Sequence, residues 1–187
     1  MNSNLQIISG ELKGRKLKIP TSARPTQNRA RVAVFNIING FFNKDDKIHV
    51  WDAFAGSGAF GFEILSEYIN SDVLFSDKSI EAISIIRENL AKLEINSRAK
   101  TDKTDTISVI NKYIADMDLI FLDPPYADNE LGMNFVQKWI KNGKNGSVLI
   151  WEQDNSNSVL PNNNNIEILR DKKYGRARFI FMRKNND

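Results

Sequence analysis

The chain has 187 residues, 41% of them hydrophobic and 26% charged, a composition typical of one globular domain and not of a disordered or fibrous protein. Cysteine is absent and His49 is the single histidine, which argues against disulfides, thiolate or zinc sites and a Ser-His-Asp triad, so we expect no metal. No apolar run reaches the roughly 18 residues that span a bilayer, and residues 1–10 lack a signal-peptide pattern. We expect a soluble, cytoplasmic protein.

The net charge of +3 conceals an asymmetry along the chain. Residues 1–36 carry seven Lys and Arg against one acid, and residues 170–187 carry seven against two. The middle of the chain is therefore acidic, with 12 basic and 20 acidic residues. Basic ends on an acidic body favour contact with a polyanion through the ends, although solvated tails without a partner are the simpler alternative.

The first elements form a short extension. Alternating stretches at Leu5 to Ser9 and Lys16 to Ile19 flank the glycines of residues 10–14, which predicts a β-hairpin. An amphipathic helix is expected over residues 28–42. We divide the chain into this basic extension, residues 1–42, and a larger domain, residues 43–187.

From Ile48 onward, apolar runs alternate with helical periodicity. The predicted strands are residues 48–54, 73–76, 99–101, 118–122 and 147–151, and the predicted helices between them are residues 58–68, 79–93, 104–113 and 131–141. This alternation predicts an α/β fold with a mostly parallel sheet covered by helices on both faces. After an Asn-rich connector over residues 154–165, two strands at 166–169 and 178–182, joined through residues 171–175, would close a seven-stranded sheet as an antiparallel C-terminal hairpin.

A glycine-rich turn follows the first parallel strand. Gly56 to Gly61 satisfies G-x-G-x-x-G, a pattern that lets backbone amides approach a ligand at a helix N-terminus. Asp77 ends the next strand, where a carboxylate can accept hydrogen bonds from ribose hydroxyls. Asp52 precedes the turn and is better placed for an ammonium group than for a pyrophosphate, which favours S-adenosylmethionine over NAD.

The predicted donor pocket has further members. It contains Asp52, Phe54, Gly56, Gly58, Asp77, Lys78 and Asp105. Asp105 follows the third strand and could meet the adenine amine, but capping the next helix is an equally good role for it.

A more specific signal follows the fourth strand. Asp123-Pro124-Pro125-Tyr126 opens at the same edge of the sheet as the glycine turn. Asp123 and the Pro124 carbonyl can accept the two hydrogens of an exocyclic amine, and Tyr126 can stack on the base. Holding both hydrogens favours the pyramidal nitrogen that attacks a sulfonium methyl group. These four residues are our catalytic candidates.

These motifs together resemble those of a known family. The pieces are residues 7–10 with 13–17, Arg24-Pro25-Thr26 with Arg31, Phe35 and Asn36, the turn at 52–61, Asp123 to Tyr126, and Tyr174-Gly175. The chain resembles the bacterial guanine-N2 methyltransferases that modify 16S ribosomal RNA. The resemblance implies a Rossmann-like methyltransferase fold, S-adenosylmethionine as donor and a guanine amine as acceptor. Where the family usually has Glu, this chain has Val32, and where Glu commonly ends the second strand it has Asp77.

Ribosomal RNA is a dense polyanion, so the basic extension is the expected RNA-contacting arm. Its candidate residues are Lys13, Arg15, Lys16, Arg24, Arg29 and Arg31. We expect a monomer that acts on 16S RNA, either naked or within the small ribosomal subunit. The alternatives are a DNA adenine-N6 or cytosine-N4 methyltransferase, a non-catalytic RNA-binding assembly protein and, more distantly, an NAD-dependent oxidoreductase.

Overall fold

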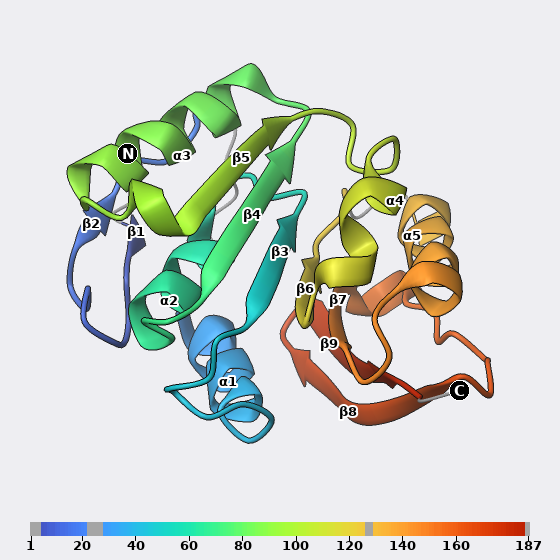
Figure 1. Ribbon diagram of the computed structural model, residues 1–187. Coiled ribbons are helices and arrows are strands. Elements are labelled where there is room, and N and C mark those ends of the chain that lie inside the picture. The colour runs from blue at the N-terminus through green and yellow to red at the C-terminus, as the bar shows by residue number, and fades with distance from the viewer. Residues whose placement is uncertain (1–4, 22–27, 126–128, 186–187) are drawn as a thin grey trace.

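The structure is a computed structural model that describes residues 5–21, 28–125 and 129–185. A seven-stranded sheet has the order β5-β4-β3-β6-β7-β9-β8 (Figure 1). Its strands are β3 (His49–Ala53), β4 (Asp72–Asp77), β5 (Ala99–Lys103), β6 (Leu119–Leu122), β7 (Val148–Asp154), β8 (Ile166–Tyr174) and β9 (Ala177–Lys184). The first five are parallel, and β9 and β8 close the sheet as an antiparallel hairpin. The predicted Rossmann-like architecture is confirmed.

Helices cover both faces of this sheet (Figure 1). One face packs against α1 (Asn28–Ile38), α2 (Ala59–Glu67) and α3 (Ile80–Lys92), and the other packs against α4 (Ile110–Tyr113) and α5 (Asn129–Asn142). Short 3-10 turns lie at η1 (Asn96–Arg98), η2 (Ile114–Asp116) and η3 (Asn155–Asn157). The central strands are apolar on both faces because each face is buried under helices, which is why their sequences show continuous hydrophobic runs.

The N-terminal β-hairpin consists of β1 (Leu5–Gln6) and β2 (Lys16–Leu17). Its turn packs against the last residues of α2: Ser66 accepts hydrogen bonds from the backbone N–H groups of Glu11 (3.0 Å, at its carbonyl) and Leu12 (2.9 Å, at its hydroxyl). Gly10 has a φ of +74°, and a Cβ there would collide with the Ser66 backbone. Helix α2 begins at the carboxyl ends of the strands and runs back along the sheet. The turn at its far end therefore lies about 14 Å from the carboxyl edge, at the amino edge of the sheet.

Three elements differ from the sequence-based predictions. The helix predicted over residues 104–113 is reduced to α4, because the side chain of Asp105 accepts a hydrogen bond from the Ile107 N–H (2.9 Å) and forms a turn first. The connection predicted at residues 171–175 belongs mostly to β8, which pairs with β9 as far as Tyr174. The helix predicted to reach Phe42 ends at Ile38.

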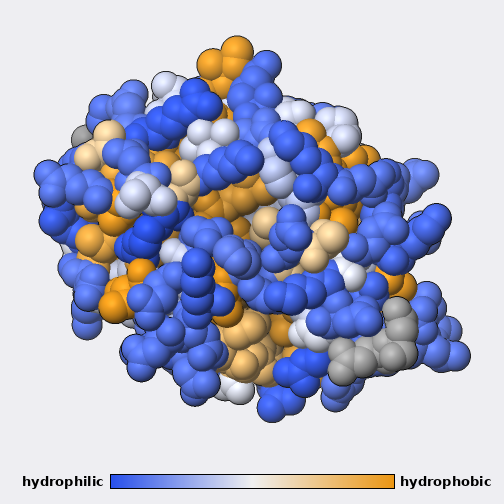
Figure 2. Space-filling view, in the orientation of Figure 1, coloured by the Kyte–Doolittle hydropathy of each residue, from blue (hydrophilic) through white to orange (hydrophobic). Residues whose placement is uncertain are grey.

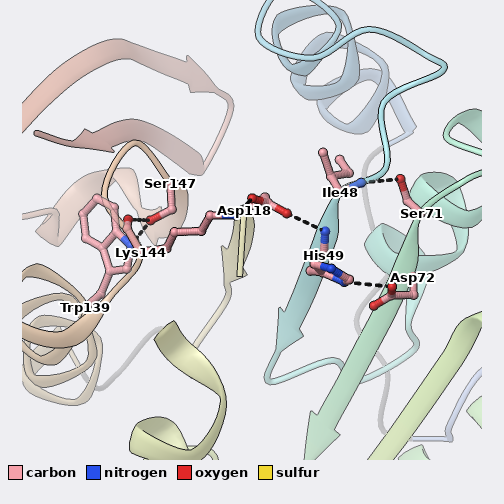
Figure 3. A network of polar contacts seen from close by, with 8 residues as sticks. All are labelled: Ile48, His49, Ser71, Asp72, Asp118, Trp139, Lys144 and Ser147. Atoms are coloured by element: carbon pink, nitrogen blue, oxygen red, sulfur yellow. Dashed lines mark hydrogen bonds and ion pairs between the residues drawn. The ribbon is translucent and has the colours of Figure 1, made fainter. Parts of the chain in front are cut away.

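A polar network ties the amino ends of the central strands together (Figure 3). The Asp118 carboxylate accepts a hydrogen bond from the His49 backbone N–H (2.8 Å) and forms an ion pair with Lys144 (2.5 Å). The His49 ring lies 2.8 Å from the Asp72 carboxylate. The single histidine is therefore at the edge opposite the glycine turn and takes part in holding β3 to its neighbours.

Hydrophilic residues cover most of the face shown in Figure 2, and hydrophobic residues are visible between them. Among the described residues, no helix is long and apolar enough to cross a membrane.

Candidate active site

The site lies where the chain direction across the sheet reverses. Strand β3 pairs with β4 on one side and with β6 on the other, and successive crossovers pass to opposite faces. Ligands of open α/β sheets bind at such a switch point, beyond the carboxyl ends of the strands. Ala53 at the end of β3 is aligned with Leu122 at the end of β6, and the Asp123 N–H donates to the Ala53 carbonyl at 3.5 Å. The glycine turn and Asp123 are thus neighbours, as predicted.

The glycine turn has an unusual backbone. Phe54, Gly56 and Gly58 have φ values of +63°, +51° and +73°. Such a conformation costs a bulky residue like Phe54 on the order of 1 to 3 kcal/mol, and it persists because the surrounding structure holds it. A Cβ at Gly58 would lie 2.9 Å from the Phe62 ring, whereas a Cβ at Gly56 would meet nothing closer than 3.9 Å. The turn is therefore packed below Gly58 and open at Gly56.

Asp77 connects this turn to β4. One carboxylate oxygen accepts from the Gly56 N–H (2.9 Å) and the other accepts from the Ser79 N–H (2.8 Å). A carboxylate has about four lone-pair sites, so each oxygen keeps acceptor capacity for a ligand hydroxyl. Asp77 is half-buried, with a face toward solvent. Its position fits the predicted ribose contact and also fixes the turn.

Asp52 lies beneath the turn. It is 2% exposed and accepts a hydrogen bond from the Gly61 N–H at 3.0 Å. Burial raises the pKa of the Asp52 carboxyl to about 8, the bond from Gly61 opposes this rise, and the charge of Asp77 adds to it. The raised pKa means that the site favours a proton or another positive charge at Asp52.

These features fit S-adenosylmethionine. Its sulfonium and ammonium groups are cations, and two neighbouring carboxylates, Asp52 and Asp77, repel one another until a cation or a proton is near. The open backbone at Gly56 leaves space for a ligand beside the start of α2. The residues present are therefore suited to a cationic nucleoside.

The residues after β6 form the predicted acceptor side. Asp123 is half-buried, Pro124 is buried and Pro125 is exposed. Neither proline can donate a backbone hydrogen bond, so this segment offers acceptors to a ligand. Tyr126 lies outside the described residues.

Two other donor-pocket candidates are more peripheral. Asp105 is exposed, and its carboxylate accepts from the Ile107 N–H in the turn before α4; it does not cap that helix, whose N-cap residue is Val109. Lys78 is exposed at the end of β4.

A buried chain of hydrogen bonds that supports this edge of the sheet was not predicted from the sequence. The Trp51 indole donates to the Ser76 hydroxyl (2.8 Å), which lies 3.2 Å from the Thr106 hydroxyl. Because these residues come from β3, β4 and the loop after β5, the chain fixes that loop beside the site.

The basic residues predicted to contact RNA fall into separate places. Lys13, Arg15 and Lys16 are exposed on the N-terminal hairpin, and Arg29 is exposed in the first turn of α1. Arg24 lies outside the described residues.

Arg31 differs from its prediction as an RNA contact. It is 5% exposed, and its guanidinium lies 3.3 Å from the Glu63 carboxylate and donates to the Gln6 carbonyl (2.6 Å). Burial lowers the pKa of Arg31 and raises that of Glu63, and their mutual attraction opposes both shifts. This side chain joins the N-terminal hairpin to α1 and α2 and does not reach the surface.

Comparison with known proteins identifies the family. Residues 5–183 match a protein family described as "Conserved hypothetical protein 95". Ribosomal RNA small subunit methyltransferase D of Buchnera aphidicola (subsp. Baizongia pistaciae) is 33% identical over 98% of this chain and 94% of its own length. The chain belongs to this methyltransferase D family. The family member from Escherichia coli is 32% identical over 67% of this chain and 62% of its own length.

Solved structures share the fold of this chain. A structure described as the methyltransferase yhhF of Escherichia coli has a TM-score of 0.86 at 24% identity and covers 98% of this chain and 99% of its own. A methylase structure from Haemophilus influenzae has a TM-score of 0.80 at 23% identity, with the same coverage. At these identities the likeness establishes a methyltransferase fold.

Proposed function

We propose that this protein transfers a methyl group from S-adenosylmethionine to the exocyclic N2 amine of a guanine in 16S ribosomal RNA. The observation that carries the proposal is the position of Asp123-Pro124-Pro125, one residue beyond β6 and beside the glycine turn after β3. The names of the curated relatives support ribosomal RNA of the small subunit as the substrate. We expect the enzyme to act in the cytoplasm as a monomer, on RNA or on an assembling subunit.

The donor side of the site would be organised by the chain's own carboxylates. Asp77 would accept hydrogen bonds from ribose hydroxyls with the lone pairs that the Gly56 and Ser79 amides leave. Asp52 would stabilise the ammonium group of the methionine moiety. S-adenosylmethionine supplies the electrophilic methyl group when it is bound.

On the acceptor side, an amine conjugated with a purine ring is a poor nucleophile. The Asp123 carboxylate and the Pro124 carbonyl would accept its two hydrogens and favour the pyramidal nitrogen, an interaction that strengthens toward the transition state. The nitrogen would gain a C–N bond as the C–S bond of the sulfonium breaks and the neutral thioether leaves, and it would give up one proton, for which the Asp123 carboxylate is the proposed acceptor. Catalysis then depends mainly on positioning the two reactants in line.

The RNA must present its base at this edge, and flipping a base out of its stack costs a few kcal/mol. Phosphate contacts would orient the RNA without reading its sequence. Lys13, Arg15, Lys16, Arg24 and Arg29 remain the proposed contacts of the N-terminal extension.

The experiment is transfer of labelled methyl from S-adenosylmethionine to small-subunit particles and to RNA from cells that lack this gene, followed by nucleoside analysis. We expect N2-methylguanosine, and we expect Asp123→Ala to lower kcat about 100-fold or more because one preorganised contact of the transition state is lost. Calorimetry with the donor should show the same affinity for Asp123→Ala and wild type.

If only duplex DNA became labelled, the proposed donor site would stand, but the proposal that RNA is the substrate would be overturned. An Asp123→Ala enzyme with near wild-type turnover would overturn the mechanism, and absence of donor binding by the wild type would overturn the whole proposal.

A further inference from the structure

We infer that the tip of the C-terminal hairpin is a second RNA-contacting surface, which binds the phosphate backbone next to the target nucleotide. The tip surface is defined here as Arg170, Lys172, Lys173 and Arg176, in the second half of β8 and in the β8–β9 connection. The inference rests on the proposed function, because it assumes an RNA substrate at the carboxyl edge of the sheet.

The register of the strands places this tip at the carboxyl edge of the sheet, which we call the reacting edge because Asp123 lies there. Leu122 of β6 aligns with Trp151 of β7, Trp151 with Ile180 of β9, and Ile180 with Asp171 of β8. Asp123 and Lys172 each lie one residue beyond that line, so they are at the same level.

Three strand spacings separate β6 from β8, which puts the backbones of Asp123 and Lys172 about 14 Å apart. About four nucleotides at the stacked rise of ~3.4 Å cover this distance. A strand whose base enters the site can therefore reach the tip with its neighbouring phosphates.

Two charges of the tip, those of Lys172 and Lys173, remain available to a ligand because the nearby acids are paired with arginines. Arg178 binds the Asp171 carboxylate through two nitrogens (2.8 and 2.6 Å), and Arg176 lies 2.8 Å from Asp154. The hydrogen bonds from Arg178 hold the pKa of Asp171 below its usual range, and hydrogen bonds from Ser156, followed by the one from Arg176, do the same for the pKa of Asp154.

Lys172 and Lys173 are exposed, and neither forms a hydrogen bond or ion pair with any residue that the structure describes. Residues 170–178 hold five cations and one acid, and the end of β7 adds Glu152 and Asp154. The corner therefore keeps a net charge of +2 beside a site lined by carboxylates.

The tip is also held rigidly, so its cations can position a bound strand. Arg178 donates a third bond to the Ser158 hydroxyl (2.6 Å), and the Arg176 carbonyl accepts from the Asn155 N–H (2.7 Å). The rings of Tyr174 and Phe179 pack with centroids 6.0 Å apart. Contacts on a fixed element orient a substrate at lower entropic cost than contacts on a flexible tail.

The test compares Lys172→Gln/Lys173→Gln with Lys44→Gln/Lys47→Gln. Both double variants remove two exposed lysine charges, but Lys44 and Lys47 precede β3 at the amino edge and have no hydrogen-bond or ion-pair partner among the described residues. Binding and methylation are measured with a short RNA stem-loop that carries the target guanine, over a series of salt concentrations.

For the tip variant we expect kcat/KM at low salt to fall about tenfold and the slope of log affinity against log salt to become shallower by about 1.4, as loss of two single-strand phosphate contacts requires. Donor affinity and the unfolding midpoint should not change, and the Lys44/Lys47 variant should match wild type. A tip variant with wild-type kcat/KM and salt slope would overturn this inference while leaving the proposed function intact. A wild-type enzyme that methylates no RNA would instead overturn the proposed function.

Discussion

The two β-hairpins of the molecule are both positively charged, but they lie at opposite edges of the sheet and on opposite sides of the molecule (Figure 1). The N-terminal turn packs on Ser66 at the far end of α2, about one helix length from the reacting edge. The C-terminal tip is level with Asp123. The comparison shows that charge alone does not locate a catalytic interface, because basic residues lie both level with Asp123 and about one helix length away from it.

The comparison implies two kinds of RNA contact. Cations at the tip would orient the nucleotides that enter the site, whereas cations of the N-terminal hairpin would bind RNA that extends beyond it. A long RNA or a ribosomal subunit can reach both, and a short stem-loop reaches the tip first. The predictions below test this difference, from the largest expected effect to the smallest.

The largest effect is expected on stability, where Arg31 attaches the N-terminal hairpin to the helices. Arg31→Met leaves the buried Glu63 carboxylate without its cation, which should lower the free energy of unfolding by about 3 to 5 kcal/mol. Urea denaturation measures this change. The matched control is Lys18→Met, which removes an exposed ion pair to Glu88 and should cost about 1 kcal/mol or less.

The two results separate a structural cation from a surface one within the same hairpin region. A loss for Arg31→Met no greater than that for Lys18→Met would show that the buried pair does not anchor the hairpin.

A smaller effect is expected for the exposed cations of the N-terminal hairpin. Lys13→Gln/Arg15→Gln/Lys16→Gln should weaken binding of 16S RNA about tenfold at low salt, because three phosphate contacts are lost. With the short stem-loop the loss should be clearly smaller, since this hairpin lies far from the reacting edge. Filter binding with both RNAs measures the difference. Equal losses on the two RNAs would remove the distinction between the hairpins.

The smallest effect is expected on the number of protons released when the donor binds. Neither hairpin should influence this number. Because burial raises the pKa of Asp52 to about 8, the carboxyl is mostly protonated at pH 7. A cationic donor favours the carboxylate, so binding should release part of a proton, and donor affinity should rise as pH increases from about 6 toward 7.5.

Calorimetry in two buffers of different ionisation enthalpy counts that proton. Asp52→Asn should abolish the release, and the Lys172→Gln/Lys173→Gln enzyme should retain it. An equal proton count for wild type and Asp52→Asn would show that another group titrates.

Local sequence patterns predicted the architecture and the adjacency of the glycine turn and Asp123. The glycine turn and Asp123 each follow an apolar strand, and parallel strands bring their carboxyl ends to one edge, so local patterns were enough to place them together. Arg31 was mistaken for a surface cation because its partner, Glu63, is 32 residues away in the sequence. A pairing of that kind depends on tertiary packing.

The C-terminal hairpin was underestimated for a similar reason. Residues 171–173 are charged and resemble a loop, but they form the exposed edge strand of the sheet and pair with β9. Edge strands commonly carry charged residues, especially lysine, so their sequences give little strand signal.

The most direct test of the account is nucleoside analysis of 16S RNA from cells that lack this gene, complemented with the wild type or with Asp123→Ala. The account predicts that 16S RNA from cells without the gene lacks one N2-methylguanosine. Complementation with the wild type should restore this nucleoside, whereas complementation with Asp123→Ala should not. An unchanged content of N2-methylguanosine in cells without the gene would contradict it.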